Sequence, residues 1–226
     1  TFAYELVVIL QDGMRRMYEH KDNIFYYVTV MNENYHQPAM PKGAEEGILK
    51  GIYPFSKGGR KKSRVQLMGS GTILREVIAA AELLENEWDV SADVWSVTSF
   101  NELRRDGIDA ERWNMLHPGK KKRIPYISQQ LAKTKGPVVA ATDYMRTYAD
   151  QVRNYIDRTY IVLGTDGFGR SDMRAALRRF FEVNRYYVVV AALMALAEEG
   201  EVDAKTVTAA IKQYGIDPEK PNPVTV

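Results

Sequence analysis

The chain has 226 residues, of which 45% are hydrophobic and 27% are charged, so it has enough apolar residues for a globular core. Its formal net charge of +2 favours neither a nucleic-acid-binding nor a membrane-surface protein. The absence of cysteine excludes disulfides and thiolate chemistry and is compatible with the cytoplasm. The longest uncharged apolar run, "YYVVVAALMALA", is shorter than the ~20 residues that a membrane-spanning helix needs.

The N-terminal part contains few predicted elements. Apolar residues at helical spacing predict a helix over 3–18, and "IFYYVTV" (24–30), rich in aromatic and β-branched residues, predicts a buried strand. A connecting segment with Pro38 and Pro41 follows. The basic, glycine-rich residues 56–63 are typical of an exposed linker, and we place the main domain boundary there.

Strands and helices alternate in the remainder, residues 64–226. The predicted strands are 64–69, 91–100, 137–143 and 159–166. The predicted helices are 72–87, 101–116 with a break near Gly107, 144–156, 171–181, 185–200 and 203–215. This alternation predicts an α/β fold with a mostly parallel sheet of about five strands and helices on both faces.

A glycine-containing turn, "LMGSGTILREV" (67–77), joins the first of these strands to its helix. It resembles part of a dinucleotide-binding turn, in which a third small residue lets the helix pack closely on the strand. Leu74 stands at that third position. We therefore interpret the segment as a tight strand-to-helix turn and keep nucleotide binding as the alternative.

A second glycine-rich loop, "LGTDGFGRSD" (163–172), has the same strand-to-helix layout. Ser171 is suited to an N-cap, and Asp172 to the first turn of the following helix. Asp166 and Asp172 would repel a phosphate, and Arg170 is the only nearby positive charge that would oppose them. The loop is therefore predicted to be a structural turn, with a ligand or subunit contact at Asp166 and Arg170 as the alternative.

His36 is the histidine with the most informative surroundings. It follows the predicted strand at 24–30 and stands three residues after Glu33. Histidine and glutamate can act as acid and base when a site shifts their pKa values. Hydrogen bonding in a buried connection is the structural alternative, and no metal-ligand spacing or hydrolase nucleophile motif accompanies the pair.

Two short basic runs, "KGGRKK" (57–62) and "GKKKR" (119–123), occur in predicted loops. Aromatic residues do not alternate with them, as a single-strand nucleic-acid binder would require. We interpret both runs as solvated loops. The alternative is that one of them binds an acidic protein partner.

Several longer motifs together resemble one family. "NENYHQPAMPKGAEEGILKGIY", "VQLMGSGTILREV", "DVWSVTSFNELRRDGIDAERWNMLHP", "ATDYMRTYADQVRNYI" and "VLGTDGFGRSDMRAALRRFFEVNRYYVVVAAL" resemble the homodimeric bacterial pyruvate dehydrogenases, which are built like transketolase. The resemblance extends in order over nearly all of the chain. It implies that residues 1–55 are the end of a pyrimidine-binding domain and a connector, and that residues 64–226 are the C-terminal domain.

The resemblance also implies an activity for the complete enzyme, namely decarboxylation of pyruvate on thiamine diphosphate and Mg²⁺ and reductive acetylation of lipoyl groups. The implied partners are a second copy of the chain and the dihydrolipoamide acetyltransferase component. The family's diphosphate motif has no counterpart here, because Thr165 replaces a glycine in "TDGFG" and the next asparagine, Asn184, comes too soon. We therefore assign this chain no catalytic, cofactor-binding or metal-binding residue. Glu33, His36, Asp166 and Arg170 are the residues expected near the active site or an interface.

Two alternatives remain, a free-standing nucleotide-binding α/β domain and a module that docks a complex through its basic loops. If residues 1–55 are a domain fragment, the predicted strand at 24–30 leaves its backbone groups unpaired at both edges. We expect that strand to pair with a second copy, to join the main sheet, or to be covered by upstream protein.

Overall fold

A single five-stranded sheet forms the centre of the computed structural model, which describes residues 1–226. The strand order is β1-β3-β2-β4-β5. Strands β2 to β5 are parallel to their neighbours, and β1 is antiparallel to β3. The strands are β1 (Ile52–Ser56), β2 (Ser63–Gly69), β3 (Val90–Val97), β4 (Val138–Ala141) and β5 (Tyr160–Leu163). The predicted α/β class and the mostly parallel sheet are confirmed.

The middle of the sheet is covered on both faces. All eight residues of β3 are buried, although Asp93 and three other members of the strand carry polar or small side chains. In parallel register Val65 of β2 lies beside Ala92, and Leu67 lies between Val94 and Val139. Such uniformly buried strands are typical of a parallel sheet between two layers of helices, and this explains why the strand prediction succeeded here.

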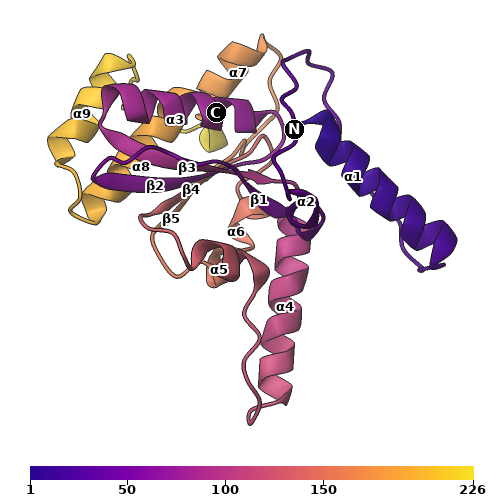
Figure 1. The fold of residues 1–226 in the computed structure, drawn as a ribbon. Coiled ribbons are helices and arrows are strands. Elements are labelled where there is room, and N and C mark those ends of the chain that lie inside the picture. The colour runs from indigo at the N-terminus through magenta and orange to yellow at the C-terminus, as the bar shows by residue number, and fades with distance from the viewer.

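Helices form a layer on each face of the sheet (Figure 1). One layer contains α3 (Ile73–Glu87), α8 (Arg185–Glu198) and α9 (Ala204–Gln213), which pack their buried side chains with those of β2 and β3. The other layer contains α4 (Phe100–Leu116), α5 (Tyr126–Leu131) and α6 (Thr147–Asp150). Two short helices, α2 (Glu45–Lys50) and α7 (Arg174–Phe180), lie at the margins of these layers.

The predicted break near Gly107 is wrong, because α4 runs without interruption from Phe100 to Leu116. The glycine allows a close approach, since a Cβ at this position would lie 2.2 Å from Cε2 of Tyr155. The single helix predicted over 144–156 is also wrong. There the chain forms α6 and a separate 3₁₀ turn at Arg153–Tyr155, and the hydroxyl of Tyr160 donates to the Ala149 carbonyl at the end of α6.

Residues 174–198 are long and apolar enough to cross a membrane, but half of their most apolar stretch is buried inside the protein. Two separate helices occupy this stretch, α7 and α8. In α8, Val189, Leu193 and Leu196 are fully buried against the sheet and α3. The apolar character of α8 is therefore that of a core helix.

The N-terminal helix α1 (Ala3–Met14) continues as one π-helical turn, Arg15–Glu19, and extends away from the sheet (Figure 1). Its first turn is anchored, because Phe2 is buried in the core beside α3. The strand predicted at 24–30 is wrong, since these residues have no regular secondary structure and Phe25 and Tyr27 are 88% and 87% exposed. No other strand lies beside them to accept their backbone hydrogen bonds, and they do not join the main sheet.

Candidate functional site

The carboxyl ends of β2 and β4 mark the point at which the connections of the sheet change direction. From β2 the chain passes to β3 on one side, whereas β4 and β5 are added on the other side. Gly69 at the end of β2 lies beside Ala141 at the end of β4. Open α/β sheets bind their ligands at such a point, so this edge is the first place to examine for a site.

The turn after β2 is tightly packed. A Cβ at Gly69 would lie 2.6 Å from the Cα of Leu74, and Gly71 has a φ of +58°. Leu74 itself is completely buried. Gly69 therefore serves the close packing of α3 on the sheet, and Gly71 supplies the positive φ of the turn, so this geometry favours the tight turn over the nucleotide-binding alternative.

Asp143 follows β4 at the same edge. Its Oδ1 is the one buried side-chain polar atom in the chain that has no hydrogen-bond partner. Burial raises the pKa of the Asp143 carboxyl, and the positive charge of Arg178 opposes that rise. A carboxyl placed in this way is a typical feature of functional edges. Sequence reasoning missed Asp143, although its position as the last residue of the predicted strand "PVVAATD" was visible.

A group of charged side chains lies next to this edge, and we call it the arginine–glutamate cluster. Glu33 contacts Arg75 of α3 at 2.6 Å and Arg178 of α7 at 2.8 Å. Glu76 of α3 contacts Nε of Arg185 at 3.0 Å and Nη1 of Arg178 at 3.4 Å. The cluster consists of Glu33, Arg75, Glu76, Arg174, Arg178 and Arg185.

The guanidinium groups determine the ionisation of the two glutamates. Burial tends to raise the pKa of Glu33, but hydrogen bonds from Arg178 and Arg75 outweigh it and hold that pKa below its usual value. Burial acts on Glu76 in the same direction and is outweighed by hydrogen bonds from Arg185, so the pKa of Glu76 is also lowered. Both carboxyls are therefore ionised at neutral pH and are occupied by arginine, which makes them poor general acids or bases.

The cluster fastens the segment Thr29–Glu33 to the C-terminal sheet. Two further hydrogen bonds help, since the Tyr144 hydroxyl donates to Thr29 Oγ1 at 2.8 Å and Arg174 donates to Asn32 Oδ1 at 2.7 Å. Residues that are far apart in the sequence are thereby held across the carboxyl edge. The arrangement can position a neighbouring segment, but it does not include a nucleophile beside a base.

The other predicted site residues lie outside the cluster. His36 is exposed, and no hydrogen bond joins it to Glu33. Asp166 accepts from the backbone N–H of Arg146 at 3.1 Å, and the guanidinium of Arg170 lies 5.2 Å from the centre of the Phe180 ring. The structure therefore brings Glu33 to a charged centre but does not combine it with His36, Asp166 or Arg170.

The loop 163–172 turns a corner at the same side of the molecule. Gly167 has a φ of +101°, and a Cβ there would lie 2.4 Å from the carbonyl oxygen of Pro223. The expected N-cap at Ser171 is wrong, because α7 begins at Arg174 with Met173 as its N-cap. Asp172 instead accepts from the Met173 N–H at 2.7 Å. These contacts favour the structural interpretation of the loop.

An open groove of about 660 Å³ lies beside this loop, between α7 and the last residues of the chain. Arg170 and Lys220 both lie 5.2 Å from the centre of the Phe180 ring in its wall. Lys220 is already paired with Glu182 at 2.9 Å, and Asp172 adds a negative charge. The groove therefore has no net positive centre suited to a phosphate. Nowhere in the chain do three or more His, Cys, Asp or Glu side chains form a group that could hold a metal ion.

Comparison with known proteins agrees with this architecture. The model of the "Transketolase-like TK C-terminal domain" family matches residues 51–184, and the chain belongs to that family. The "Pyruvate dehydrogenase E1 component middle domain" model matches residues 1–38. The chain is homologous to the C-terminal part of the pyruvate dehydrogenase E1 component, as the resemblance in the sequence predicted.

The similar proteins are much longer than this chain. It is 59% identical over 226 residues to the pyruvate dehydrogenase E1 component of Pseudomonas aeruginosa, covering 99% of this chain and 26% of that protein. The corresponding protein of Escherichia coli K12 is 57% identical over 225 residues, covering 99% and 25%. Among solved structures, a transketolase from Leishmania mexicana has a TM-score of 0.46 and 18% identity, covering 72% of this chain and 20% of that one. The chain thus spans about a quarter of the length of these E1 relatives.

Proposed function

We propose that this chain acts as the C-terminal portion of an enzyme that decarboxylates pyruvate and reductively acetylates lipoyl groups of a dihydrolipoamide acetyltransferase. The observation that carries the proposal is the order of the two family matches. A middle-domain match over residues 1–38 precedes a C-terminal-domain match over residues 51–184, as in a longer E1 component. Identity of 55–59% to three E1 components over almost the whole chain supports the same conclusion.

In this proposal, residues 1–55 are the end of a pyrimidine-binding domain and its connector, residues 56–63 are a linker, and residues 64–226 are the C-terminal domain. The exposed apolar side chains near the N-terminus support it, because Leu10, Met14, Phe25 and Val30 are 48–88% exposed. Apolar surface of this extent is typical of an interface. Upstream residues of the same domain would cover it. The edge strand β1 adds a direct backbone connection between the connector and the C-terminal sheet.

The cofactor would be held by the upstream portion. Thiamine diphosphate with Mg²⁺ requires hard oxygen ligands for the metal and donors for the diphosphate. This chain does not fit that requirement, because no group of three acidic or histidine side chains is placed to hold a metal ion and Glu33 is occupied by arginines. The role of this portion is therefore to position Thr29–Glu33 and to form the wall and dimer contacts near the active site.

The proposed assembly is a cytoplasmic homodimer that works with the acetyltransferase component. Exposed apolar side chains in the loops that follow β4 and β5 support a subunit contact, since Met145, Phe168 and Met173 are 50%, 82% and 81% exposed. Phe168 and Met173 belong to the same loop region as Asp166 and Arg170. We therefore place Asp166 and Arg170 at this interface and Glu33 at the wall of the site.

A reconstitution experiment tests the proposal. The 226-residue chain alone should bind no thiamine diphosphate at micromolar concentration by calorimetry and should not decarboxylate pyruvate. Mixing it with the separately expressed upstream portion, thiamine diphosphate and Mg²⁺ should restore decarboxylation, measured with an artificial electron acceptor. Micromolar affinity of the chain alone for thiamine diphosphate would contradict the proposal. A mixture that does not decarboxylate pyruvate, together with a full-length enzyme that decarboxylates a different 2-oxo acid, would also contradict it. Titration of the chain with nucleotides in the same calorimeter tests the alternative at the turn 69–71.

A further inference from the structure

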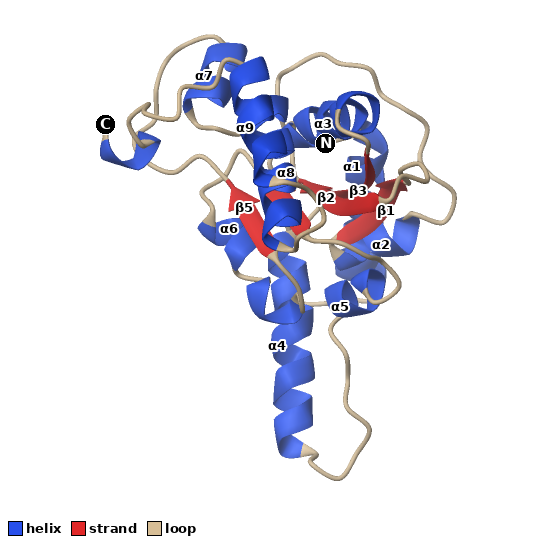
Figure 2. Cartoon of the chain, turned by 90° about the vertical axis from the view of Figure 1, so that its left-hand side faces the viewer, coloured by secondary structure: helices blue, strands red, loops and turns tan.

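The outer end of α4 and the loop after it project from the body of the protein (Figures 1 and 2). The inner part of α4 packs on the sheet through Leu103, which is completely buried, and Ala110, 5% exposed, is the last buried residue of the helix. Beyond this point the helix leaves the core. We call residues 113–124 the α4 tip.

The α4 tip has a defined internal structure. The Asn114 side chain donates to the Arg123 carbonyl at 2.9 Å and accepts from the Arg123 N–H at 2.8 Å, so it joins the helix to the returning loop. The Trp113 ring is stacked on His117 with a centroid distance of 3.4 Å, and the Arg123 guanidinium lies 4.0 Å from the centre of the Trp113 ring. These contacts present the tip as a preformed surface, so little conformational entropy would be lost when it binds a partner.

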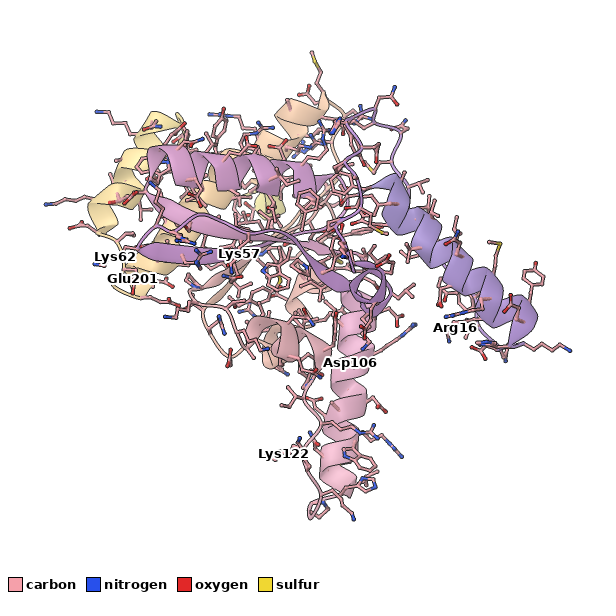
Figure 3. The ribbon with its side chains drawn as sticks, in the orientation of Figure 1. Arg16, Lys57, Lys62, Asp106, Lys122 and Glu201 are labelled. Carbon is pink, nitrogen blue, oxygen red and sulfur yellow. The ribbon has the colours of Figure 1, made fainter.

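Positive charge and apolar side chains are both exposed on the α4 tip. Lys120, Lys121 and Lys122 form no ion pair within the chain, and Figure 3 shows Lys122 far from the sheet. Arg123 is the one member of the basic run with a partner, Asp109 at 3.2 Å. Between these charges Met115, Leu116 and Ile124 are 71%, 51% and 57% exposed.

This combination fits an acidic protein surface better than other anionic partners. Single-stranded nucleic acid binds by stacking its bases on exposed aromatic rings, but Trp113 already has His117 and Arg123 on its faces. Binding to an anionic membrane requires a broad apolar face, commonly with aromatic residues, whereas the tip exposes three aliphatic or thioether side chains. A protein interface combines a small apolar centre with a charged rim, as the tip does.

We propose that the α4 tip is a docking surface for a carboxylate-rich face of a partner protein, and that the acetyltransferase component is this partner. The proposal rests on the proposed function, because that function supplies the partner. In it, Met115, Leu116 and Ile124 form the apolar centre of the contact, and the three lysines pair with carboxylates around it. Charged pairs at such a rim act mainly on the association rate and on its salt dependence.

The test uses the full-length enzyme and the purified acetyltransferase component as the probe. The tip variant carries Lys120→Glu, Lys121→Glu and Lys122→Glu. A control variant with the same change of charge carries Lys133→Glu, Lys205→Glu and Lys212→Glu, which are exposed lysines without ion pairs elsewhere in the chain. Thermal unfolding of both variants checks that they fold. Affinity is then measured at low and at moderate salt concentration.

The tip variant should bind the acetyltransferase about tenfold more weakly at low salt, with a weaker salt dependence, while the control variant changes less than twofold. A second variant, Met115→Ser with Leu116→Ser, should weaken binding without changing its salt dependence. Unchanged affinity in both tip variants would overturn the proposal. So would tip-dependent binding of phosphatidylserine vesicles or an oligoribonucleotide in place of the acetyltransferase, or tip-dependent dimerisation of the enzyme alone.

Two further readouts separate the possible failures. Pyruvate decarboxylation by the unsubstituted enzyme with an artificial acceptor tests the proposed function without the acetyltransferase, and the tip variants should retain it. An enzyme that binds through the tip but does not decarboxylate pyruvate would contradict the proposed function alone. Chemical acetylation of Lys120, Lys121 and Lys122 in the full-length enzyme should be rapid, because these side chains are exposed. Protection of the three lysines in the absence of the acetyltransferase would mean that upstream residues cover the tip, and it would overturn the proposal.

Discussion

Helix α8 and the segment Ile24–Met31 are both rich in apolar residues, yet their surroundings are opposite. In α8, Val189 and Leu193 are completely buried between the sheet and α3. In the N-terminal segment, Phe25 and Tyr27 are almost completely exposed, and the backbone forms no regular structure. Composition predicted burial for both. The difference shows that a neighbouring element, rather than apolar character alone, determines whether a segment is buried and which secondary structure it forms.

The largest expected effect compares these two segments directly. Leu193→Ala should lower the free energy of unfolding by about 2–5 kcal/mol, because the deleted methyl groups leave a cavity in a closed core. Phe25→Ala removes a larger side chain but should change that free energy by less than about 0.5 kcal/mol, since the ring is 88% exposed. Urea denaturation of the 226-residue chain measures both. Similar losses for the two variants would contradict the comparison.

A glycine in the packed region gives the second expected effect. Gly→Ala within an exposed helix stabilises by about 1 kcal/mol, but Gly107→Ala should destabilise by about 1–3 kcal/mol because the new Cβ would lie 2.2 Å from the Tyr155 ring. In a chain that also carries Tyr155→Ser, Gly107→Ala should raise the free energy of unfolding instead of lowering it, since the ring that the new Cβ would meet is absent. A double-mutant cycle by chemical denaturation tests this, and additive effects would mean that the two residues are not in contact.

The third prediction concerns the attachment between the two regions. Glu33→Gln should weaken the attachment of residues 24–33 by about 1 kcal/mol, because Arg75 and Arg178 lose a charged partner. The pKa of Glu33 is lowered in the folded chain. The stabilisation that ionised Glu33 gives to the attachment should therefore be complete at pH values above the unfolded pKa of about 4.3. It should be lost as the pH falls through the pKa of Glu33 in the folded chain.

Backbone ¹⁵N relaxation of residues 24–33 measures this attachment. At pH 6 the Glu33→Gln variant should show lower order parameters there than the unsubstituted chain, and the difference should shrink at pH values below about 4. Lys133→Gln, an exposed substitution without an ion pair, serves as the control. A difference that is independent of pH would mean that the charge of Glu33 does not hold the segment.

The smallest expected effect on stability comes from making the N-terminal segment polar. Phe25→Ser, Tyr27→Ser and Val30→Ser together should change the free energy of unfolding of the chain by less than about 1 kcal/mol, since all three side chains are 71–88% exposed. The same variant should nevertheless lose most of its ability to restore decarboxylation with the upstream portion. Full restoration by this variant would contradict the assignment of this surface to the preceding domain.

Much of the C-terminal fold was predictable because local and long-range signals agree there. The buried strand β3 is bounded by a helix on each side, and its position was predicted closely. Strand β1 was missed because "IYPFS" contains Pro54, which argues against a central strand. At the edge of the sheet this proline is tolerated, since an edge strand has one side without a ladder partner. Edge position is a tertiary property that the local pattern does not contain.

The candidate site was predictable only in part. Glu33 was recognised because polar residues after an apolar run commonly lie at a functional edge. Its partners Arg75 and Arg178 stand 42 and 145 residues away in the sequence, so a local pattern could not identify them. Asp143 could have been found from its place after a strand, whereas the absence of its hydrogen-bond partner depends on how α3 and α7 pack.

The position of β1 has a consequence for how the chain can be divided. The strand adds to one edge of the sheet, and residues 57–62 connect it to β2 by a largely exposed loop. A polypeptide cut within this loop would leave residues 1–56 as a separate peptide, while β2 to β5 keep their mutual pairing. That peptide could return by β-strand addition next to β3. The chain therefore offers a split point at which two separate pieces could be joined again by backbone hydrogen bonds at the edge of the sheet.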